Sequence, residues 1–150
     1  ETLAYLEQLP LARVRGDATL VHGSPRYPEW EYVTDSQAAA ENLAYFKTPG
    51  CFNGHTHIPA VFMQEDGGRM SLLRPRIGAT VSPGSRRFMA NPGSVGQPRD
   101  GDARAAYALF DTELCELTFR RVEYDSRATQ RLMLEAGLPI ALAERLSYGR

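Results

Sequence analysis

The sequence predicts a single domain of mixed α and β structure. Its 150 residues are 43% hydrophobic and 23% charged, which provides a core of ordinary size for one compact unit. Leucines at helical spacing open the chain, short apolar runs that end at glycine turns follow, and two longer runs make a late hairpin. No internal repeat, low-complexity tract or linker interrupts residues 1–150, so we expect one domain.

A short helix and a strand are expected first. Leucines recur at helical spacing over residues 3–9, and Pro10 ends the segment. The apolar run 18–21 then stops at His22 and a Gly-Ser-Pro turn, which predicts a buried strand whose end presents this histidine. The loop that follows, RYPEWEY, is rich in proline and aromatic residues.

A second helix is expected after this loop. Thr34 and Gln37 have the spacing of a capping box with Thr34 at the N-cap, and Val33 is the apolar residue before it. The Pro-Gly pair at residues 49–50 ends the helix. Its apolar face is formed by Ala39, Leu43 and Phe46.

The middle of the chain is expected to form strands. Residues 51–53 and 58–63 are extended runs on either side of GHTH. The Asp-Gly-Gly sequence at 66–68 predicts a hairpin into residues 70–73. Residues 75–85 have the composition of a loop.

Three more strands and two helices are expected in the rest of the chain. The strands cover residues 87–90, 105–110 and 114–122, and the last two form a hairpin. The loop NPGSVGQPRDGD lies between the first two of these strands. Asp125 or Ser126 caps a helix that Gly137 ends, and Pro139 begins a last short helix. The charges on these two helices are expected on a solvated face.

Charge and composition exclude several classes of function. The net charge is −1 and no basic run or basic helix face occurs, so we expect no duplex nucleic acid as a partner. No apolar stretch approaches the ~20 residues of a membrane span, and no signal-like segment opens the chain, so we expect no membrane partner. Cys51 and Cys115 lie in apolar contexts without metal-ligand spacing, which favours reduced thiols and a cytoplasmic location.

The three histidines of the chain are the candidate functional residues. His22, His55 and His57 all lie where a strand meets a glycine-containing turn. If the chain is extended over residues 54–57, side chains two residues apart point to one side, roughly 6.6 Å apart along the backbone. His55 and His57 would then face one site and bind one metal, or two ions about 3.5–4 Å apart as in two-metal phosphoester hydrolysis. Spacing alone leaves structural histidines, a mononuclear three-histidine zinc site and a dinuclear site open.

The loop NPGSVGQPRDGD is the second candidate region. Asn91 can cap backbone groups, Gly93 can expose its amide, and Arg99 can pair with a substrate phosphate. The alternative is a structural turn in which Arg99 is bonded to Asp100 or Asp102.

Aromatic residues before the second helix allow two interpretations. Trp30 and Tyr32, with Tyr27 nearby, either stack on a nucleobase beside the site or fix their loop to the core. Asp17, Asp111 and Asp125 are interpreted as turn or cap residues.

Three segments in this order, VHGSP, GHTHIP and NPGSVGQPRDGD, resemble the second half of a calcineurin-like metallophosphoesterase. The likeness is to the small bacterial phosphodiesterase branch, which is also similar to diadenosine-tetraphosphatase-type enzymes, and it spans nearly the whole chain. The resemblance implies the C-terminal half of a four-layer αββα sandwich that holds two divalent metal ions, Mn²⁺, Fe or Zn²⁺, at the ends of its strands. By motif, His22 and His55 resemble ligands of one metal, and His57 resembles a ligand of the other.

The resemblance further implies hydrolysis of a phosphate ester, such as a small phosphodiester or nucleotide, by metal-activated water. In that chemistry the metals polarise the phosphoryl oxygens and lower the pKa of the attacking water. Two alternatives remain open: an inactive, protein-binding scaffold with the same fold, and a mononuclear three-histidine zinc hydrolase.

The family's first motifs, Asp-x-His, Gly-Asp and Asn-His, do not occur with their pattern in this sequence. Gly16-Asp17 and Gly101-Asp102 lack the surrounding residues of the Gly-Asp motif, and no Asn-His pair is present. The missing motifs would supply a bridging Asp, an Asn ligand and the proton-donating His. Together with a start at Glu1, this predicts a C-terminal fragment that needs the N-terminal half of the same protein to complete a two-metal site.

Overall fold

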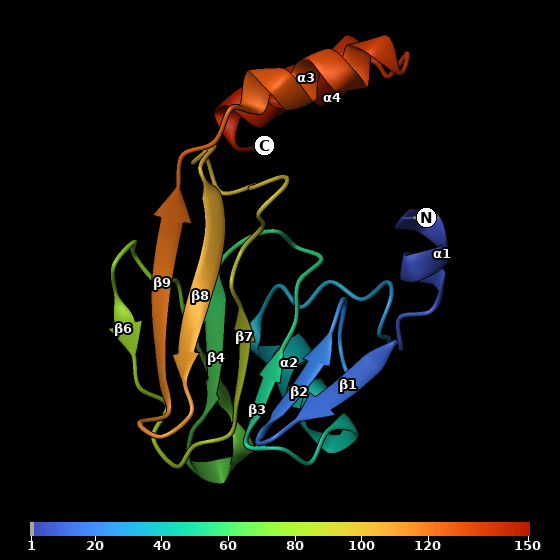
Figure 1. Ribbon diagram of the computed structural model, residues 1–150. Coiled ribbons are helices and arrows are strands. Elements are labelled where there is room, and N and C mark those ends of the chain that lie inside the picture. Colours follow the sequence, from blue (N-terminus) through green and yellow to red (C-terminus); the bar gives the residue numbers. More distant parts are fainter. Residues whose placement is uncertain (1) are drawn as a thin grey trace.

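The computed structural model describes residues 2–150 as two β-sheets packed face to face, with a helical arm (residues 126–148) beyond one end of the smaller sheet (Figure 1). The larger sheet has six strands in the order β1-β2-β3-β7-β4-β5. Strands β2, β3 and β7 run parallel, and the other neighbours run antiparallel. The six strands are β1 (Ala12–Arg15), β2 (Ala18–Val21), β3 (Gly50–Phe52), β4 (Ala60–Gln64), β5 (Met70–Leu73) and β7 (Phe88–Asn91).

The smaller sheet is antiparallel and has the order β6-β9-β8. Its strands are β6 (Thr80–Val81), β8 (Ala105–Asp111) and β9 (Glu116–Val122). The α-helices are α1 (Thr2–Glu7), α2 (Ser36–Asn42), α3 (Ser126–Glu135) and α4 (Ile140–Glu144). Short 3-10 turns at Leu43–Tyr45 and Arg145–Tyr148 continue α2 and α4, and a third covers Asp66–Gly68.

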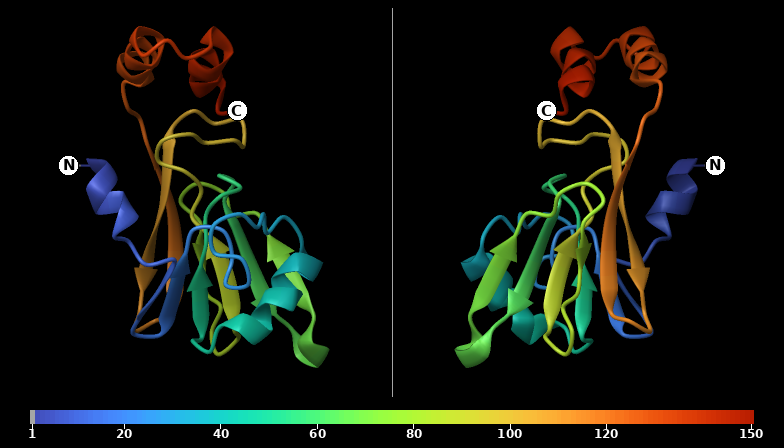
Figure 2. Two further views of the ribbon diagram at one scale, coloured as in Figure 1. Left: turned by 90° about the vertical axis from the view of Figure 1, so that its right-hand side faces the viewer. Right: turned by 90° about the vertical axis from the view of Figure 1, so that its left-hand side faces the viewer.

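Two hydrophobic clusters lie on opposite faces of the six-stranded sheet. One packs under α2, which covers the outer face of this sheet in both side views (Figure 2). The other lies between the two sheets. Adjacent residues of β4 enter different clusters, because strand side chains alternate between faces: Val61 lies between the sheets and Phe62 lies under α2. The mixed α/β fold class is confirmed, and residues 2–150 provide three layers in the order helix, sheet, sheet.

Most predicted elements are present, and two strands were missed. All four residues of β1 are exposed, so this strand has no buried and exposed alternation to identify it. Strand β6 lies inside residues 75–85, which the sequence predicted as a loop, and it is only two residues long. Helix α1 agrees with prediction, but none of its side chains is buried.

The predicted N-cap of α2 was wrong by one residue. The Asp35 carboxylate, rather than Thr34, accepts hydrogen bonds from the backbone N–H groups of Gln37 and Ala38, at 3.0 and 2.9 Å. The Thr34 hydroxyl instead donates to Asp35. A carboxylate that accepts hydrogen bonds from both N–H groups caps the helix more strongly than a hydroxyl group does. Ala39 is fully buried, as its place on the predicted apolar face requires.

Both cysteines are free thiols. Cys51 is fully buried, and this burial raises the pKa of its thiol to about 12, which keeps it protonated and unreactive. Cys115 is half-buried. None of the helices among residues 2–150 combines the length and the apolar character needed to cross a membrane.

Candidate metal centre

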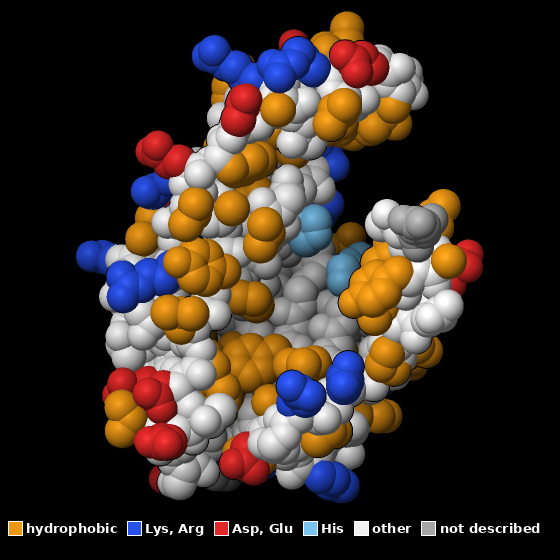
Figure 3. All heavy atoms as spheres, in the orientation of Figure 1, with side chains coloured by type: hydrophobic (Ala, Val, Ile, Leu, Met, Phe, Trp, Pro, Cys, Tyr) orange, Lys and Arg blue, Asp and Glu red, His pale blue; other side chains and the backbone are white. Residues whose placement is uncertain are grey.

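Two of the three histidines leave the same edge of the six-stranded sheet. Strands β2 and β3 are parallel neighbours, so their carboxyl ends meet, and His22 and His55 follow these ends. The Gly54 N–H donates to the His22 carbonyl at 2.7 Å and ties the two turns together. Figure 3 shows the histidine side chains in a hollow beneath the helical arm.

The His22 and His55 rings face each other directly. His22 Nε2 lies 2.9 Å from His55 Nδ1, and the ring centroids are 4.8 Å apart in an edge-to-face arrangement. The Tyr32 ring packs on His55 with its centroid 4.0 Å away. Tyr32 is 50% exposed and its ring contacts a site histidine rather than the core, so both interpretations of the aromatic loop stay predictions.

The chain between residues 54 and 57 is a turn, so the condition of an extended chain over these residues is not met. His55 and His57 both have φ of 62°, the left-handed region that side-chain-bearing residues seldom occupy. The Asn91 side-chain amide holds the turn by donating to the Gly54 carbonyl at 2.6 Å and to Thr56 Oγ1 at 2.8 Å. Backbone strain of this kind concentrates at functional sites.

His57 is oriented by a backbone carbonyl. Its Nδ1 donates to the Gln97 carbonyl oxygen at 2.7 Å, which fixes the tautomer and leaves the lone pair on Nε2. Metal-binding histidines commonly make this kind of outer contact. The turn thus directs the two histidines apart, with His55 toward His22 and His57 toward the loop that contains Gln97.

Burial and neighbouring basic groups lower the pKa of both imidazoles of the turn, which favours their neutral form. Burial is the main cause that lowers the pKa of His55, and the proximity of His22, His57 and Arg99 lowers it further. Burial also lowers the pKa of His57. The hydrogen bond to the Gln97 carbonyl raises this pKa, whereas the nearby Arg99 lowers it further. Neutral imidazole is the form that binds metals.

The donor set fits a divalent metal, and it is incomplete. Two nitrogens that bind one ion at about 2.0–2.1 Å lie roughly 2.9–3.4 Å apart, close to the 2.9 Å between His22 and His55. Asn53, next to the site in sequence, is buried with both amide atoms lacking a partner. However, no three His, Cys, Asp or Glu side chains of residues 2–150 converge as a metal site would require.

Asn91 and Gly93 have structural roles. Asn91 is 1% exposed, and its Oδ1 accepts from the Gly93 N–H at 2.8 Å, in agreement with the predicted capping role. Gly93 has φ of 93°, and a Cβ there would lie 2.6 Å from Ala106 Cβ. The Asn91 side chain and the Gly93 N–H are engaged within the chain, and the predicted contact of these two residues with substrate stays a prediction.

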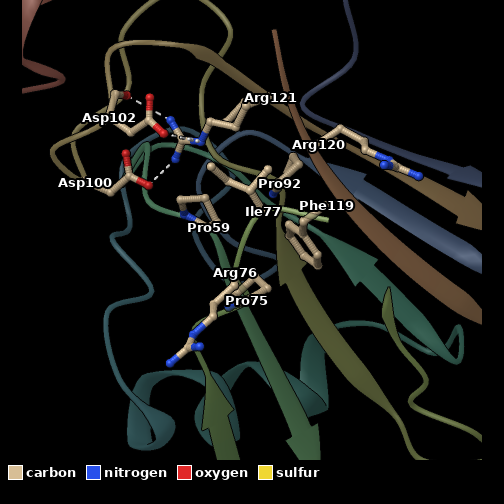
Figure 4. A pocket seen from close by; sticks show the side chains of 11 residues that line it. Pro59, Pro75, Arg76, Ile77, Pro92, Asp100, Asp102, Phe119, Arg120 and Arg121 are labelled. Carbon is tan, nitrogen blue, oxygen red and sulfur yellow. Dashed lines mark hydrogen bonds and ion pairs between the residues drawn. The ribbon is translucent and has the colours of Figure 1, made fainter. Parts of the chain in front are cut away.

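Arg99 does not pair with the acidic residues beside it, contrary to the structural alternative for this loop. Asp100 pairs with Arg121, and Asp102 pairs with Arg104 at 2.7 Å. Figure 4 shows Arg121 between both carboxylates, at one end of a cavity of about 310 Å³ lined mainly by proline and apolar side chains. Arg99 Nη2 donates to Gln97 Oε1 at 3.0 Å, and its Nε is buried without an acceptor.

A buried polar network that the sequence did not reveal holds the aromatic loop on α2. The Glu31 carboxylate accepts from Arg26, Ser24 and, at 2.9 Å, the Asn42 side chain. Burial opposes ionisation of Glu31, but these hydrogen bonds lower its pKa overall. Trp30 remains 76% exposed at the tip of this loop. The partners lie up to 11 residues apart with no shared motif, so no sequence signal identifies them.

Arg145 is the functional candidate that the sequence missed. Its charge was expected on a solvated face, but its Nε is buried without an acceptor. The Gly101 N–H donates to the Gly149 carbonyl at 3.0 Å and joins the end of the arm to the loop that contains Arg99. The positive charge of Arg145 is among the causes that lower the pKa of His57.

Comparison with known proteins identifies the class. A solved structure of a metallophosphoesterase from Sphaerobacter thermophilus is 48% identical to this chain, with a TM-score of 0.90 over 99% of the chain and 61% of that protein. This similarity confirms the resemblance of the chain to the calcineurin-like metallophosphoesterase superfamily. The bacterial phosphodiesterase branch within it stays a prediction.

Two further relatives carry no functional name. An uncharacterized protein of Methanocaldococcus jannaschii is 34% identical over 155 residues, which cover 100% of this chain and 60% of the relative. A hypothetical protein of Pyrococcus horikoshii shares the fold, with a TM-score of 0.72, 21% identity and coverage of 98% of this chain and 54% of that one. No protein-family model matches the chain. The chain thus spans between 54% and 61% of the length of these relatives.

Proposed function

We propose that this chain is part of a metal-dependent phosphoesterase in which His22, His55 and His57 bind divalent metal ions. The observation that carries the proposal is the 2.9 Å approach of His22 Nε2 to His55 Nδ1 at the ends of parallel strands. The 48% identity to a metallophosphoesterase supports the same chemistry.

His22 and His55 are proposed ligands of one ion and His57 of a second. Neighbouring groups orient two of these side chains. The Tyr32 ring holds His55, and the Gln97 carbonyl holds His57 with Nε2 available. Imidazole ligands suit Zn²⁺ and Fe, and we also propose Mn²⁺, which favours added carboxylate ligands. Bound ions would supply Lewis acidity and lower the pKa of the attacking water.

The carboxylate and amide ligands needed to complete the centre are proposed to come from the N-terminal half of the same protein. The relatives extend beyond the matched region, which leaves room for such a segment. The proposed substrate is a small phosphate ester or nucleotide, with phosphodiesters preferred. Arg99, whose Nε lacks an acceptor, is proposed to bind the substrate phosphate. The cytoplasmic location stays a prediction.

The test uses the complete protein loaded with Mn²⁺ and compares hydrolysis of bis(p-nitrophenyl) phosphate with that of p-nitrophenyl phosphate. We expect faster turnover of the diester and a loss of more than about 100-fold in His55→Ala, because loss of an outer partner alone costs about 10- to 100-fold. Lys47→Ala, an exposed change before β3 at the opposite end of the sheet, is the control and should retain activity.

Equal turnover in the His55→Ala and control variants would contradict the assignment. A complete protein that folds but neither binds metal nor turns over either ester would instead favour the scaffold alternative.

A further inference from the structure

The helices of the arm and its final turn are packed against one another. Gln130 Nε2 on α3 donates to the Ala143 carbonyl at 2.9 Å and lies 2.8 Å from Ser147 Oγ, which joins α3 to α4 and the final turn. Ala143 and Leu146 are buried. The arm therefore has a defined inner face, which includes the segment that contains Arg145.

The end of the arm is seated on the loop that orients His57. The Gly101 N–H donates to the Gly149 carbonyl, and a Cβ on Gly149 would lie 2.6 Å from the Asp102 backbone nitrogen. On the other side of this loop, the Arg99 N–H donates to the His57 carbonyl at 3.3 Å. One loop thus connects the histidine turn to Arg145 on the arm.

Arg99 and Arg145 each have a buried Nε without an acceptor. Arg87 shares this feature, but its Nη2 donates to two backbone carbonyls away from the histidines. Neither Arg99 nor Arg145 forms an ion pair with a carboxylate of residues 2–150. The nearby carboxylates of Asp100 and Asp102 pair instead with Arg121 and Arg104. A buried donor without an acceptor destabilises the protein, and an anionic ligand would remove that penalty. Figure 3 shows basic side chains beside the histidines, under the arm.

We propose that Arg145 and Arg99 together bind a phosphate group of the substrate, so that the helical arm forms one wall of the substrate site. Guanidinium groups bind phosphate oxygens in pairs of parallel hydrogen bonds, which makes arginine suited to this role. This inference rests on the proposed phosphoesterase function and deepens it. It adds Arg145, a residue outside the histidine motifs and the NPGSVGQPRDGD loop.

The experiment measures binding of inorganic phosphate by calorimetry to the complete, metal-loaded protein, with metal content determined in parallel. We expect Arg145→Ala to weaken phosphate binding by about 10- to 100-fold, the effect of one lost hydrogen-bonded charge, with metal content unchanged. Arg131→Ala removes an exposed arginine from the same arm and should leave affinity within about twofold.

A second variant keeps the inference testable if Arg145→Ala does not fold. Arg145→Lys retains the charge but loses the forked geometry, so we expect a folded protein that binds phosphate several-fold more weakly. Wild-type affinity in either folded variant, or equal weakening in Arg131→Ala, would overturn the proposal. Arg145 would then be a structural residue that contacts another segment.

The outcome separates the two proposals. If the protein binds no metal, the phosphoesterase proposal fails, and phosphate affinity of the metal-free protein still reports whether Arg145 is an anion ligand. If metal binding and turnover are normal while phosphate affinity is independent of Arg145, only the arm's role is overturned.

Discussion

Arginines around the loop of residues 97–104 fall into two sets with different surroundings. Arg121 is 5% exposed in its side chain, pairs with Asp100, and donates to the carbonyls of Asp102 and Arg104 at 2.8 and 2.9 Å. Arg99 lies in this loop and Arg145 in the arm that is hydrogen-bonded to it, and both have buried Nε atoms without acceptors. The carboxylates of the loop are thus engaged in stabilising the fold, which leaves the second set of cations available for an anionic ligand.

The largest expected effect on stability comes from the paired set. Arg121→Ala leaves Asp100 without its partner and removes two hydrogen bonds to backbone carbonyls. We expect it to lower the free energy of unfolding by about 2 to 3 kcal/mol, below the range for fully buried pairs because Asp100 is 22% exposed. Urea unfolding of the complete protein measures this change.

Arg99→Ala is the matched change in the unpaired set. It removes a cation that makes one side-chain hydrogen bond, so the free energy of unfolding should fall by less than about 1 kcal/mol. If the two variants lose equal stability, the division into a structural set and a ligand-binding set is wrong.

A smaller effect is expected from pH. Hydrogen bonding to Arg104 is the main cause that lowers the pKa of Asp102 to about 2, from an ordinary value of 3.8. A carboxyl group whose folded-state pKa is depressed stabilises the fold above its unfolded value, and this contribution disappears as pH falls through the folded value. The stability advantage of wild type over Asp102→Asn should therefore shrink between about pH 4 and pH 2. An advantage that stays constant over this range would show that the Asp102 charge does not stabilise the loop.

The sequence predicted the parts of the site that depend on local patterns. Apolar runs that stop at glycine turns identified β2 and β3, and the parallel pairing of these strands brings His22 to His55. The turn at residues 54–57 was not predicted because its geometry depends on Asn91, more than 30 residues away.

Arg145 was missed for a similar reason. Its helix begins after a proline and carries charges that look solvated in sequence, and only the contact of Gly149 with the loop at Gly101 places it near the site. Short or exposed strands such as β1 and β6 also lack a periodic signal. Local pattern thus predicts which residues lie at strand ends, whereas long-range contacts decide which of them meet.

The most direct test of the central claim is elemental analysis of metal in the complete protein, wild type and His55→Ala, with the mass of every polypeptide measured alongside. We expect about two divalent ions per wild-type chain and a clear loss of bound metal in His55→Ala. Equal metal content in both proteins, or no metal in a wild-type protein that contains the N-terminal segment, would contradict the claim that these histidines form a metal centre.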